Sequence, residues 1–410
     1  MEKRILSISA QKPNSTGSGV YLTELVKAYH QSGTPQAVIA GINAGDTVEL
    51  PEGVAFYPVR FQSEKLPFPV AGMSDVMPYA HTRYCDMDEE MIRQFITAFS
   101  DCIEKVLVQF QPDIILCHHL YLVTALAVEC VRRTGSKAKV VGICHSTCLR
   151  QFRKNELEKE RIRSRIPELH RIYALHAGQQ EEICRLFDVP VGQVQIVGAG
   201  YNDGIFFPGT AAQDDTEGVD ICFAGKVSQA KGVKSLLRSL AKVKSAKPVR
   251  LHLAGGNGDE AEVAEIRKLA TELEKKKGVF VAFEGKLPQK ELAELYRRCQ
   301  LFVLPSFYEG LPLVLLEAMA SGCLAVAADW PGVKEWIFEK VPAAELSVVS
   351  LPEMEAPGVP KENQLADYEE RLAMAISHEL EVIEHRGKQA DVSAMTWGQV
   401  AAGIEADALT

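Results

Sequence analysis

The stretch Val303-Leu-Pro-Ser-Phe-Tyr-Glu309-Gly-Leu-Pro312-Leu-Val-Leu-Leu-Glu317-Ala-Met-Ala-Ser-Gly322 decides how the second half of the chain folds. An apolar run ends at Pro305, and an apolar helical pattern opens at Pro312. Proline suits the first helical position because its missing N–H is no loss there. The pattern therefore predicts a buried strand, a short loop that carries Glu309, and a helix with Glu317 in its second turn.

The start of this helix is a predicted anion-binding site. The backbone N–H groups of Leu313 and Val314 are free to point at an anion, and the helix dipole favours negative charge there. Carboxylates would repel a phosphate, so Glu309 and Glu317 make better sense as acceptors for hydroxyl groups beside it. The alternative is a capping Glu309 and a solvated Glu317, but an unpaired carboxylate in the apolar run around Glu317 is costly to bury, which favours binding.

Short apolar runs alternate with helical patterns along most of the chain, and this alternation is typical of a parallel α/β sheet. A length of 410 residues is too great for one ordinary core. Two βαβ sets flank a break at 208–218, which is rich in Pro, Gly and Asp. We expect two doubly wound Rossmann-like domains facing across a cleft, one over 1–208, completed by a C-terminal helix at about 380–410, and one over 219–375.

The expected strands of the first domain are Arg4–Ser9, Gln36–Ile42, Ala55–Arg60, Asp113–Cys117, Lys139–Cys144, Arg171–Leu175 and Gln195–Val197. Its expected helices are Val20–Gln31, Glu89–Phe110, Tyr121–Arg133 and Gly178–Leu186. The second domain has expected strands at Asp220–Ala224, Arg250–Ala254, Phe280–Glu284, Leu301–Leu304 and Leu324–Ala327. After Pro360 only helices are expected, Ala366–His385 and one from about Thr396.

Composition narrows the function. A net charge of −9 argues against a general nucleic-acid binder. The apolar run at the start is too short for an export signal, and no stretch approaches the ~20 apolar residues of a membrane span. The ten cysteines are scattered, mostly in apolar runs, which indicates reduced, buried thiols. We therefore expect a soluble cytoplasmic protein.

A second predicted anion contact lies in Cys222-Phe-Ala-Gly-Lys226-Val-Ser-Gln-Ala-Lys231-Gly-Val. A strand runs into a glycine turn that carries Lys226 and Lys231. Two ammonium groups beside a pyrophosphate stabilise the charge that builds on a leaving group. The alternative is a pair of solvated lysines.

These segments resemble the motifs of retaining GT-B glycosyltransferases of the large family 4, over most of the second domain and more loosely the first. In that family the first glutamate, here Glu309 beside Gly310, contacts hydroxyls of the donor sugar, and the second, here Glu317, contacts the nucleotide ribose. The family usually has arginine in place of Lys226, and a lysine keeps the charge but loses the bidentate fork. We expect the base near Gly285–Leu287, against Lys286 and Leu287.

In the first domain the resemblance covers three further features. Asn14-Ser-Thr-Gly17-Ser-Gly19 resembles the family's N-terminal glycine loop, whose glycines let the backbone approach the donor. His145 falls at the family's histidine near the donor sugar, and His119 in its acceptor-side region. Met395-Thr-Trp397 resembles the closing helix that crosses back onto the first domain.

The acceptor is expected on the first domain. The candidates are His119, Tyr121, Ser146, Arg150 and Arg153, with the irregular insertion 66–88. A packed histidine is an equally good reading of His118 or His119. Residues 149–171 hold eight basic and four acidic side chains. They form either a solvated helix face or a contact for an anionic acceptor or for anionic lipid headgroups.

Other motifs are weaker. Gly256-Asn-Gly258-Asp-Glu-Ala261 has the dinucleotide spacing, but its acidic first turn favours helix capping over a nicotinamide site. Asp86-Met-Asp88 has the form of a metal-binding D-x-D in an irregular loop, where chance explains it better. Cys144, His145 and Cys148 have poor spacing for zinc. We expect neither an essential metal nor a cofactor.

The predicted function is transfer of a hexose-type sugar, with retention, from a nucleotide-diphosphate sugar to an acceptor hydroxyl. UDP-sugar is expected on family frequency, and the acceptor is a glycan, a lipid-linked group or a small molecule. A lipid-linked acceptor would imply peripheral contact with the inner membrane face. Three alternatives stay open: a nucleotide-sugar hydrolase, a dehydrogenase that uses the Gly256 turn, and a non-catalytic nucleotide-sugar-binding protein.

Overall fold

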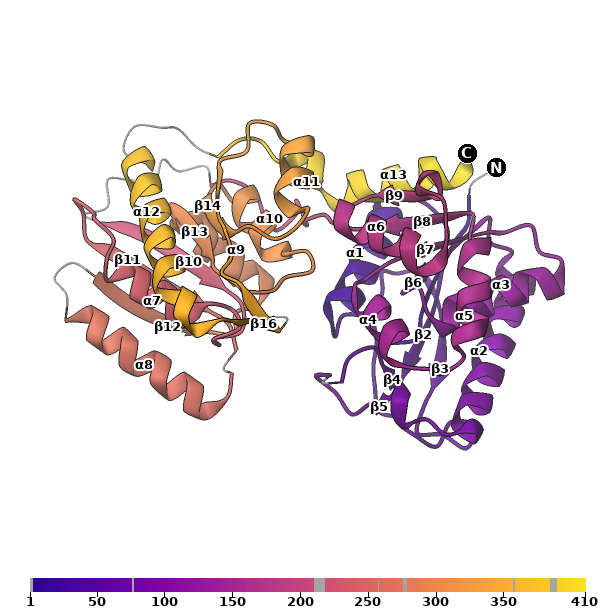
Figure 1. Cartoon of the computed structure of the whole chain (residues 1–410). Helices are drawn as coiled ribbons and strands as arrows, with labels where there is room; N and C mark the ends of the chain where they lie inside the picture. Colours follow the sequence, from indigo (N-terminus) through magenta and orange to yellow (C-terminus); the bar gives the residue numbers. More distant parts are fainter. Residues whose placement is uncertain are drawn as a thin grey trace. The chain divides into compact units, whose positions relative to one another are not determined.

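Two separate parallel sheets organise the chain in the computed structural model (Figure 1). The structure describes residues 3–75, 77–209, 218–256, 258–275, 279–356, 358–383 and 389–410. The chain divides into two compact units, Met1–Ala199 with Trp397–Thr410, and Gly200–Thr396. Each unit is a doubly wound α/β domain of the predicted class.

The first unit contains a seven-stranded sheet in the order β3-β2-β1-β6-β7-β8-β9, parallel throughout. Its inner strands are buried on both faces, which explains their continuous apolar runs. The strands are β1 Ile5–Ser9, β2 Gln36–Ile42, β3 Ala55–Arg60, β6 Ile114–His118, β7 Lys139–Ile143, β8 Arg171–Ala174 and β9 Val194–Ile196. A two-stranded sheet of β4 Ala71–Gly72 and β5 Thr82–Arg83 lies in the insertion.

Seven α-helices surround this sheet: α1 Gly17–Gln31, α2 Glu89–Phe110, α3 Leu122–Thr134, α4 Thr147–Lys154, α5 Lys159–Arg165, α6 Ala177–Phe187 and α13 Trp397–Leu409. In Figure 1, α2, α3 and α5 run together along the sheet, and α1 packs with α13. The sequence patterns predict the approximate bounds of all of these except α4 and α5, which lie largely within residues 149–171. Short 3₁₀ turns lie at Tyr84–Asp86, Ile166–Glu168 and Val191–Gln193.

The second unit contains a six-stranded parallel sheet in the order β12-β11-β10-β13-β14-β15. Its strands are β10 Val219–Ala224, β11 Val249–Ala254, β12 Val279–Gly285, β13 Leu301–Leu304, β14 Leu324–Ala328 and β15 Leu346–Val349. A small antiparallel pair follows, β16 Met354–Ala356 and β17 Val359–Pro360. The sequence patterns do not predict β15, which adds a strand beside β14.

The helices of this unit are α7 Val233–Leu240, α8 Glu260–Glu274, α9 Gln289–Arg298, α10 Leu313–Ala320, α11 Val333–Lys340 and α12 Leu365–Ile383. Right-handed crossovers place α7 and α8 on one face of the sheet and α9 and α10 on the other. Helix α12 packs on α7 and contacts β13, β14 and β15. Turns of 3₁₀ type lie at Glu362–Gln364 and Ser393–Met395.

The division of the chain differs from the expected boundaries, 1–208 and 219–375. Residues 200–209 belong to the second unit, because Phe206 packs on Tyr296 with ring centroids 6.1 Å apart and the Arg297 guanidinium stacks over Phe207 at 4.8 Å. Helix α12 also belongs to the second unit, so α13 alone returns to the first. Most of the expected linker, 210–217, lies outside the described residues.

Candidate functional site

Three glycines form the carboxyl edge of the second unit's sheet. Gly225 follows β10, Gly255 follows β11 and Gly285 ends β12. A Cβ on Gly255 would lie 1.7 Å from the Gly225 carbonyl oxygen, and the Gly225 amide donates to the Ala254 carbonyl at 2.9 Å. The neighbouring turns therefore pack backbone to backbone, which brings the ends of these strands close together.

Lys231 and Glu309 meet at this edge. The Lys231 Nζ donates to Glu309 Oε1 at 2.7 Å, with the lysine side chain 31% exposed and the glutamate 15%. Gly232 makes the approach possible: its φ is +72°, and a Cβ there would lie 2.1 Å from the Pro305 carbonyl oxygen. The Phe307 amide also donates to the Ala230 carbonyl at 3.0 Å. The two loops are thus joined along their backbones.

Helix α10 begins one residue later than expected. Pro312 is the N-cap, and Leu313 is the first helical residue. The Leu315 amide donates to the Pro312 carbonyl at 3.0 Å, whereas the amides of Leu313 and Val314 have no protein partner among the described residues. These two amides remain available to an anion, as predicted for a helix start.

The other predicted donor residues lie at the same end of the sheet. Lys226 follows Gly225 directly and is exposed. Lys286 is exposed and Leu287 half-buried, just after β12. Glu317 and Gly310 are half-buried, so Glu317 is less buried than its apolar neighbours suggest.

In the first unit, His118 ends β6 and His145 lies two residues after the neighbouring strand β7. His118 Nδ1 and His145 Nε2 are 3.1 Å apart, and the rings stack with centroids 5.3 Å apart. Burial lowers the pKa of His118 to about 3, with a smaller contribution from His119. Burial, followed by His119 and His118, also lowers the pKa of His145 well below its usual value. Both rings are therefore neutral near pH 7, and one donates to the other.

His119 belongs to the same cluster. It adopts a φ of +75°, and its Nε2 lies 3.1 Å from Gln11 Oε1. Its Nδ1 is buried and has no hydrogen-bond partner among the described residues. This nitrogen keeps an unused hydrogen-bonding position, which a packed and fully satisfied histidine would not have.

The remaining acceptor candidates differ in how well they suit binding. Ser146 has a φ of +56° at the N-cap of α4, and its Oγ accepts from Gln179 Nε2 at 2.8 Å. Arg150 is exposed and donates to Ser74 Oγ at 3.2 Å. Arg153 is paired with Glu182. Tyr121 is 1% exposed and packs edge-on against Tyr84, so its position is that of a core residue.

The N-terminal glycines differ from each other. Gly17 has open space where a Cβ would stand, whereas a Cβ on Gly19 would lie 2.8 Å from the Lys12 carbonyl oxygen. The Gly19 amide donates to Thr16 Oγ1, the N-cap of α1, at 3.2 Å. Gly19 is thus required by its own loop, and only Gly17 has room beside its backbone for a ligand.

The weaker motifs have structural explanations. Asp86 accepts two bonds from Arg83, and Asp88 caps α2 through the Met91 amide. Asp259 caps α8 through the amides of Ala261 and Glu262, as expected from its acidic first turn; Asn257 lies outside the described residues.

The Sγ atoms of Cys144 and Cys148 are 3.6 Å apart. Within the described ranges no three His, Cys, Asp or Glu side chains are arranged to hold a metal ion. No helix in this part of the chain is both long and apolar enough to cross a membrane.

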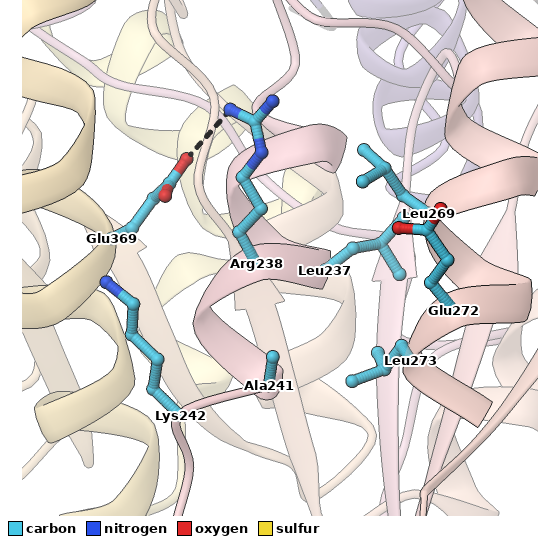
Figure 2. A pocket seen from close by; sticks show the side chains of 8 residues that line it. All are labelled: Leu237, Arg238, Ala241, Lys242, Leu269, Glu272, Leu273 and Glu369. Atoms are coloured by element: carbon cyan, nitrogen blue, oxygen red, sulfur yellow. Dashed lines mark hydrogen bonds and ion pairs between the residues drawn. The ribbon is translucent and has the colours of Figure 1, made fainter. Parts of the chain in front are cut away.

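A groove of about 380 Å³ lies away from this site, between α7, α8 and α12 (Figure 2). Leucines line it, with Arg238 and Lys242 at its border. The groove is lined by the C-terminal part of α7, from Leu237 onward, whereas Lys231 and Gly232 precede the N-terminal end of this helix. None of the predicted site residues lines it.

Sequence reasoning missed the residues that hold the Glu309 loop. Trp330 Nε1 donates to the Ser306 carbonyl at 3.0 Å, and the Tyr368 hydroxyl donates to the Pro305 carbonyl at 3.1 Å. No local motif marks either aromatic residue. Gly232, directly after Lys231, was the one visible signal that the two loops approach closely.

Solved structures of other proteins share the fold of this chain. Sucrose-phosphate synthase from Thermosynechococcus elongatus is similar over 99% of this chain and 98% of its own, with a TM-score of 0.61 and 18% identity. The Anabaena protein HepE, in complex with UDP and glucose, is similar over 99% of both chains, with a TM-score of 0.59 and 14% identity. The chain has the two-domain GT-B fold of glycosyltransferases.

The second unit also resembles a known sequence family. Residues 211–346 match the model of the glycosyl transferases group 1 family. Alpha-maltose-1-phosphate synthase of Mycolicibacterium smegmatis is 28% identical over 183 residues, which are 41% of this chain and 46% of that protein. The match thus spans less than half of this relative.

Proposed function

We propose that this protein transfers a hexose-type sugar from a UDP-sugar to an acceptor hydroxyl, with retention and without a metal ion. The observation that carries the proposal is the Lys231–Glu309 pair, 2.7 Å apart, beside the unpaired first amides of α10. The match of residues 211–346 to the glycosyl transferases group 1 family supports sugar transfer. The structural neighbour that holds UDP and glucose supports the nucleotide.

In this proposal the second unit binds the donor. The amides of Leu313 and Val314 hold the diphosphate, together with Lys226 and Lys231. An ammonium group has three donors, so Lys231 can keep its bond to Glu309 while it donates to a phosphate oxygen. The cationic groups then stabilise the charge that develops on the leaving diphosphate.

Three further contacts complete the donor site. Glu309, oriented by Lys231 and followed by Gly310, accepts from hydroxyls of the sugar. Glu317 accepts from the ribose, and Lys286 and Leu287 contact the base. The acceptor oxygen attacks the anomeric carbon on the face from which the diphosphate departs, and the departing phosphate oxygen takes the acceptor proton.

We further propose that the acceptor carries an anionic group and binds the first unit. Arg150 is exposed, and within the described part of the chain its guanidinium donates only to the Ser74 hydroxyl, so its charge can pair with a phosphate. The neutral His145 and the buried His119 offer hydrogen bonds to sugar hydroxyls, beside Gly17 and Ser146. The names of two relatives, a maltose-1-phosphate synthase and a sucrose-phosphate synthase, agree with a sugar phosphate. A lipid-linked acceptor at the inner membrane face is the alternative.

Thermal-shift screening against UDP-, GDP- and ADP-sugars, followed by transfer assays with sugar-phosphate acceptors, tests this proposal. Glu309→Gln and Lys231→Ala should each lower the transfer rate by about a hundredfold or more, because both act on the reacting sugar diphosphate. Lys234→Ala is the matched control. Lys234 lies three positions after Lys231, and it forms an ion pair with Glu265 on α8 instead of Glu309. We expect it to transfer at the wild-type rate.

Three outcomes would contradict the proposal. Unchanged rates in both site variants would remove the assigned site. Steady release of free sugar without any acceptor would indicate a hydrolase instead, and donor binding without turnover would indicate a sensor.

A further inference from the structure

The loop that carries Glu309 leaves the sheet with two backbone carbonyls that the strand ladder does not use. The last register pair of β13 with β14 is Leu304 with Ala327. The next two residues, Pro305 and Ser306, therefore need other partners for their carbonyl groups, because this part of the chain is buried.

Two aromatic side chains from distant elements supply these partners. Tyr368, fully buried on α12, donates its hydroxyl to the Pro305 carbonyl at 3.1 Å. Trp330, 3% exposed in the segment after β14, donates Nε1–H to the Ser306 carbonyl at 3.0 Å. Tyr368 also packs against Phe307, with ring centroids 5.5 Å apart. Both residues thus hold the first part of the loop, three to four residues before Glu309.

Helix α12 is itself fixed to the element that follows Lys231. Glu369, next to Tyr368, accepts from Ser235 Oγ at 3.2 Å and from Arg238 Nη1 at 3.3 Å, both on α7. Figure 2 shows the bond between Glu369 and Arg238, two of the residues that line the groove. A single helix therefore contacts the Glu309 loop through Tyr368 and the Lys231 side through Glu369.

We propose that Trp330 and Tyr368 are positioning residues that set the place of Glu309 relative to Lys231. This inference rests on the proposed function, because it assigns the two residues to the donor-sugar end of that site. Neither side chain touches Glu309, so their effect passes through the backbone of residues 305–307. A small displacement of a group that orients the reacting sugar costs much more in rate than in binding.

The test compares Trp330→Phe and Tyr368→Phe with Trp336→Phe. Trp336 is a matched control: it is buried to a similar degree, and its Nε1 has no hydrogen-bond partner among the described residues. Trp330→Phe and Tyr368→Phe should lower kcat about tenfold to a hundredfold. Their affinity for UDP alone should stay at the wild-type value, because UDP lacks the sugar that Glu309 contacts. Trp336→Phe should leave kcat and UDP affinity unchanged.

Hydrogen exchange gives a readout that does not depend on turnover. The Phe307 amide, bonded to the Ala230 carbonyl, should exchange faster in Trp330→Phe and Tyr368→Phe than in Trp336→Phe. Variants that melt at a lower temperature but keep kcat would show a purely structural role and overturn the inference. Equal exchange of Phe307 in all three variants would also overturn it. A wild-type chain that transfers from no donor overturns the proposed function itself. If only the positioning inference fails, the wild type and Lys234→Ala transfer sugar at full rate, and Trp330→Phe and Tyr368→Phe transfer it just as fast.

Discussion

At the scale of single residues, the described chain contains a partly buried charge network outside the candidate site. His252 lies between two carboxylates, with Nδ1 2.8 Å from Glu284 Oε1 and Nε2 2.9 Å from Asp220 Oδ1. The Asp220 bond, opposed by burial and supported by Glu284, raises the pKa of His252 to about 9. Burial raises the pKa of Asp220, but the bonds from His252 and Arg250 outweigh it and lower that pKa to about 2.

The raised pKa of His252 predicts a pH-dependent stability. The folded state binds the proton more tightly than the unfolded state, so this contribution is fully present below the unfolded pKa of about 6.5. It is lost as the pH rises through about 9. Urea unfolding of the wild type and of His252→Gln should therefore show a stability gap near pH 6 that shrinks by about pH 10. A gap of constant size would show that His252 is not charged in the folded protein.

At the scale of elements, the approach of the loops after β10 and β13 depends on Gly232. Gly232→Ala should destabilise the protein for two reasons, its φ of +72° and the contact of the new Cβ with the Pro305 carbonyl at 2.1 Å. Gly33→Ala is a matched control, because Gly33 has a φ of +77° and nothing within 4 Å of a Cβ. Gly33→Ala should cost about 1 kcal/mol for the backbone strain alone.

The difference between the two glycine variants isolates the contact with Pro305. We expect Gly232→Ala to cost about 1–3 kcal/mol more than Gly33→Ala in denaturant unfolding, a typical overpacking penalty. It should also weaken transfer, since it separates Lys231 from Glu309. Equal losses of stability in the two variants would mean that the loops move apart without cost.

The same elements show what the sequence can predict. The buried strand β2 and the half-buried edge strand β3 were both predicted to their ends, because apolar runs bounded by polar turns leave little freedom. The bounds of helices α4 and α5 were not predicted, since basic side chains interrupt their apolar period. Strand β15 was missed because it has four residues, of which three are only half-buried. Such short elements are fixed by their neighbours.

The candidate site, too, was predicted only where a local sequence pattern marks its residues. Its residue types and their positions after strands could be read from the sequence, and they remain predictions as functional groups. The bond between Lys231 and Glu309 could not, because 78 positions separate them and a glycine contact brings them together. Trp330 and Tyr368 were missed because a donor to a backbone carbonyl carries no local pattern.

At the scale of the whole molecule, the chain leaves its first unit at Ala199 and returns to it only with α13. This last helix is part of the first unit's core: Trp397, Val400 and Ile404 are buried. The hydroxyls of Tyr29 and Tyr173 donate to the carbonyls of Ala401 and Ile404, both at 3.2 Å. Truncation after Thr396 would therefore expose apolar surface and leave two buried tyrosine hydroxyls without partners.

These losses predict that the truncated chain loses its first unit selectively. Exposure of several large side chains at about 1.5–3 kcal/mol each approaches the 5–15 kcal/mol that stabilises a typical domain. Amide exchange should become fast in β1 to β9 and stay slow in β10 to β15, and UDP binding should persist if the donor site belongs to the second unit. Ala402→Lys, on the exposed face of the same helix, is the control and should change neither. If β1 and β6 kept their protection against amide exchange after truncation, the first unit would fold without α13, and its sheet would not need this helix for stability.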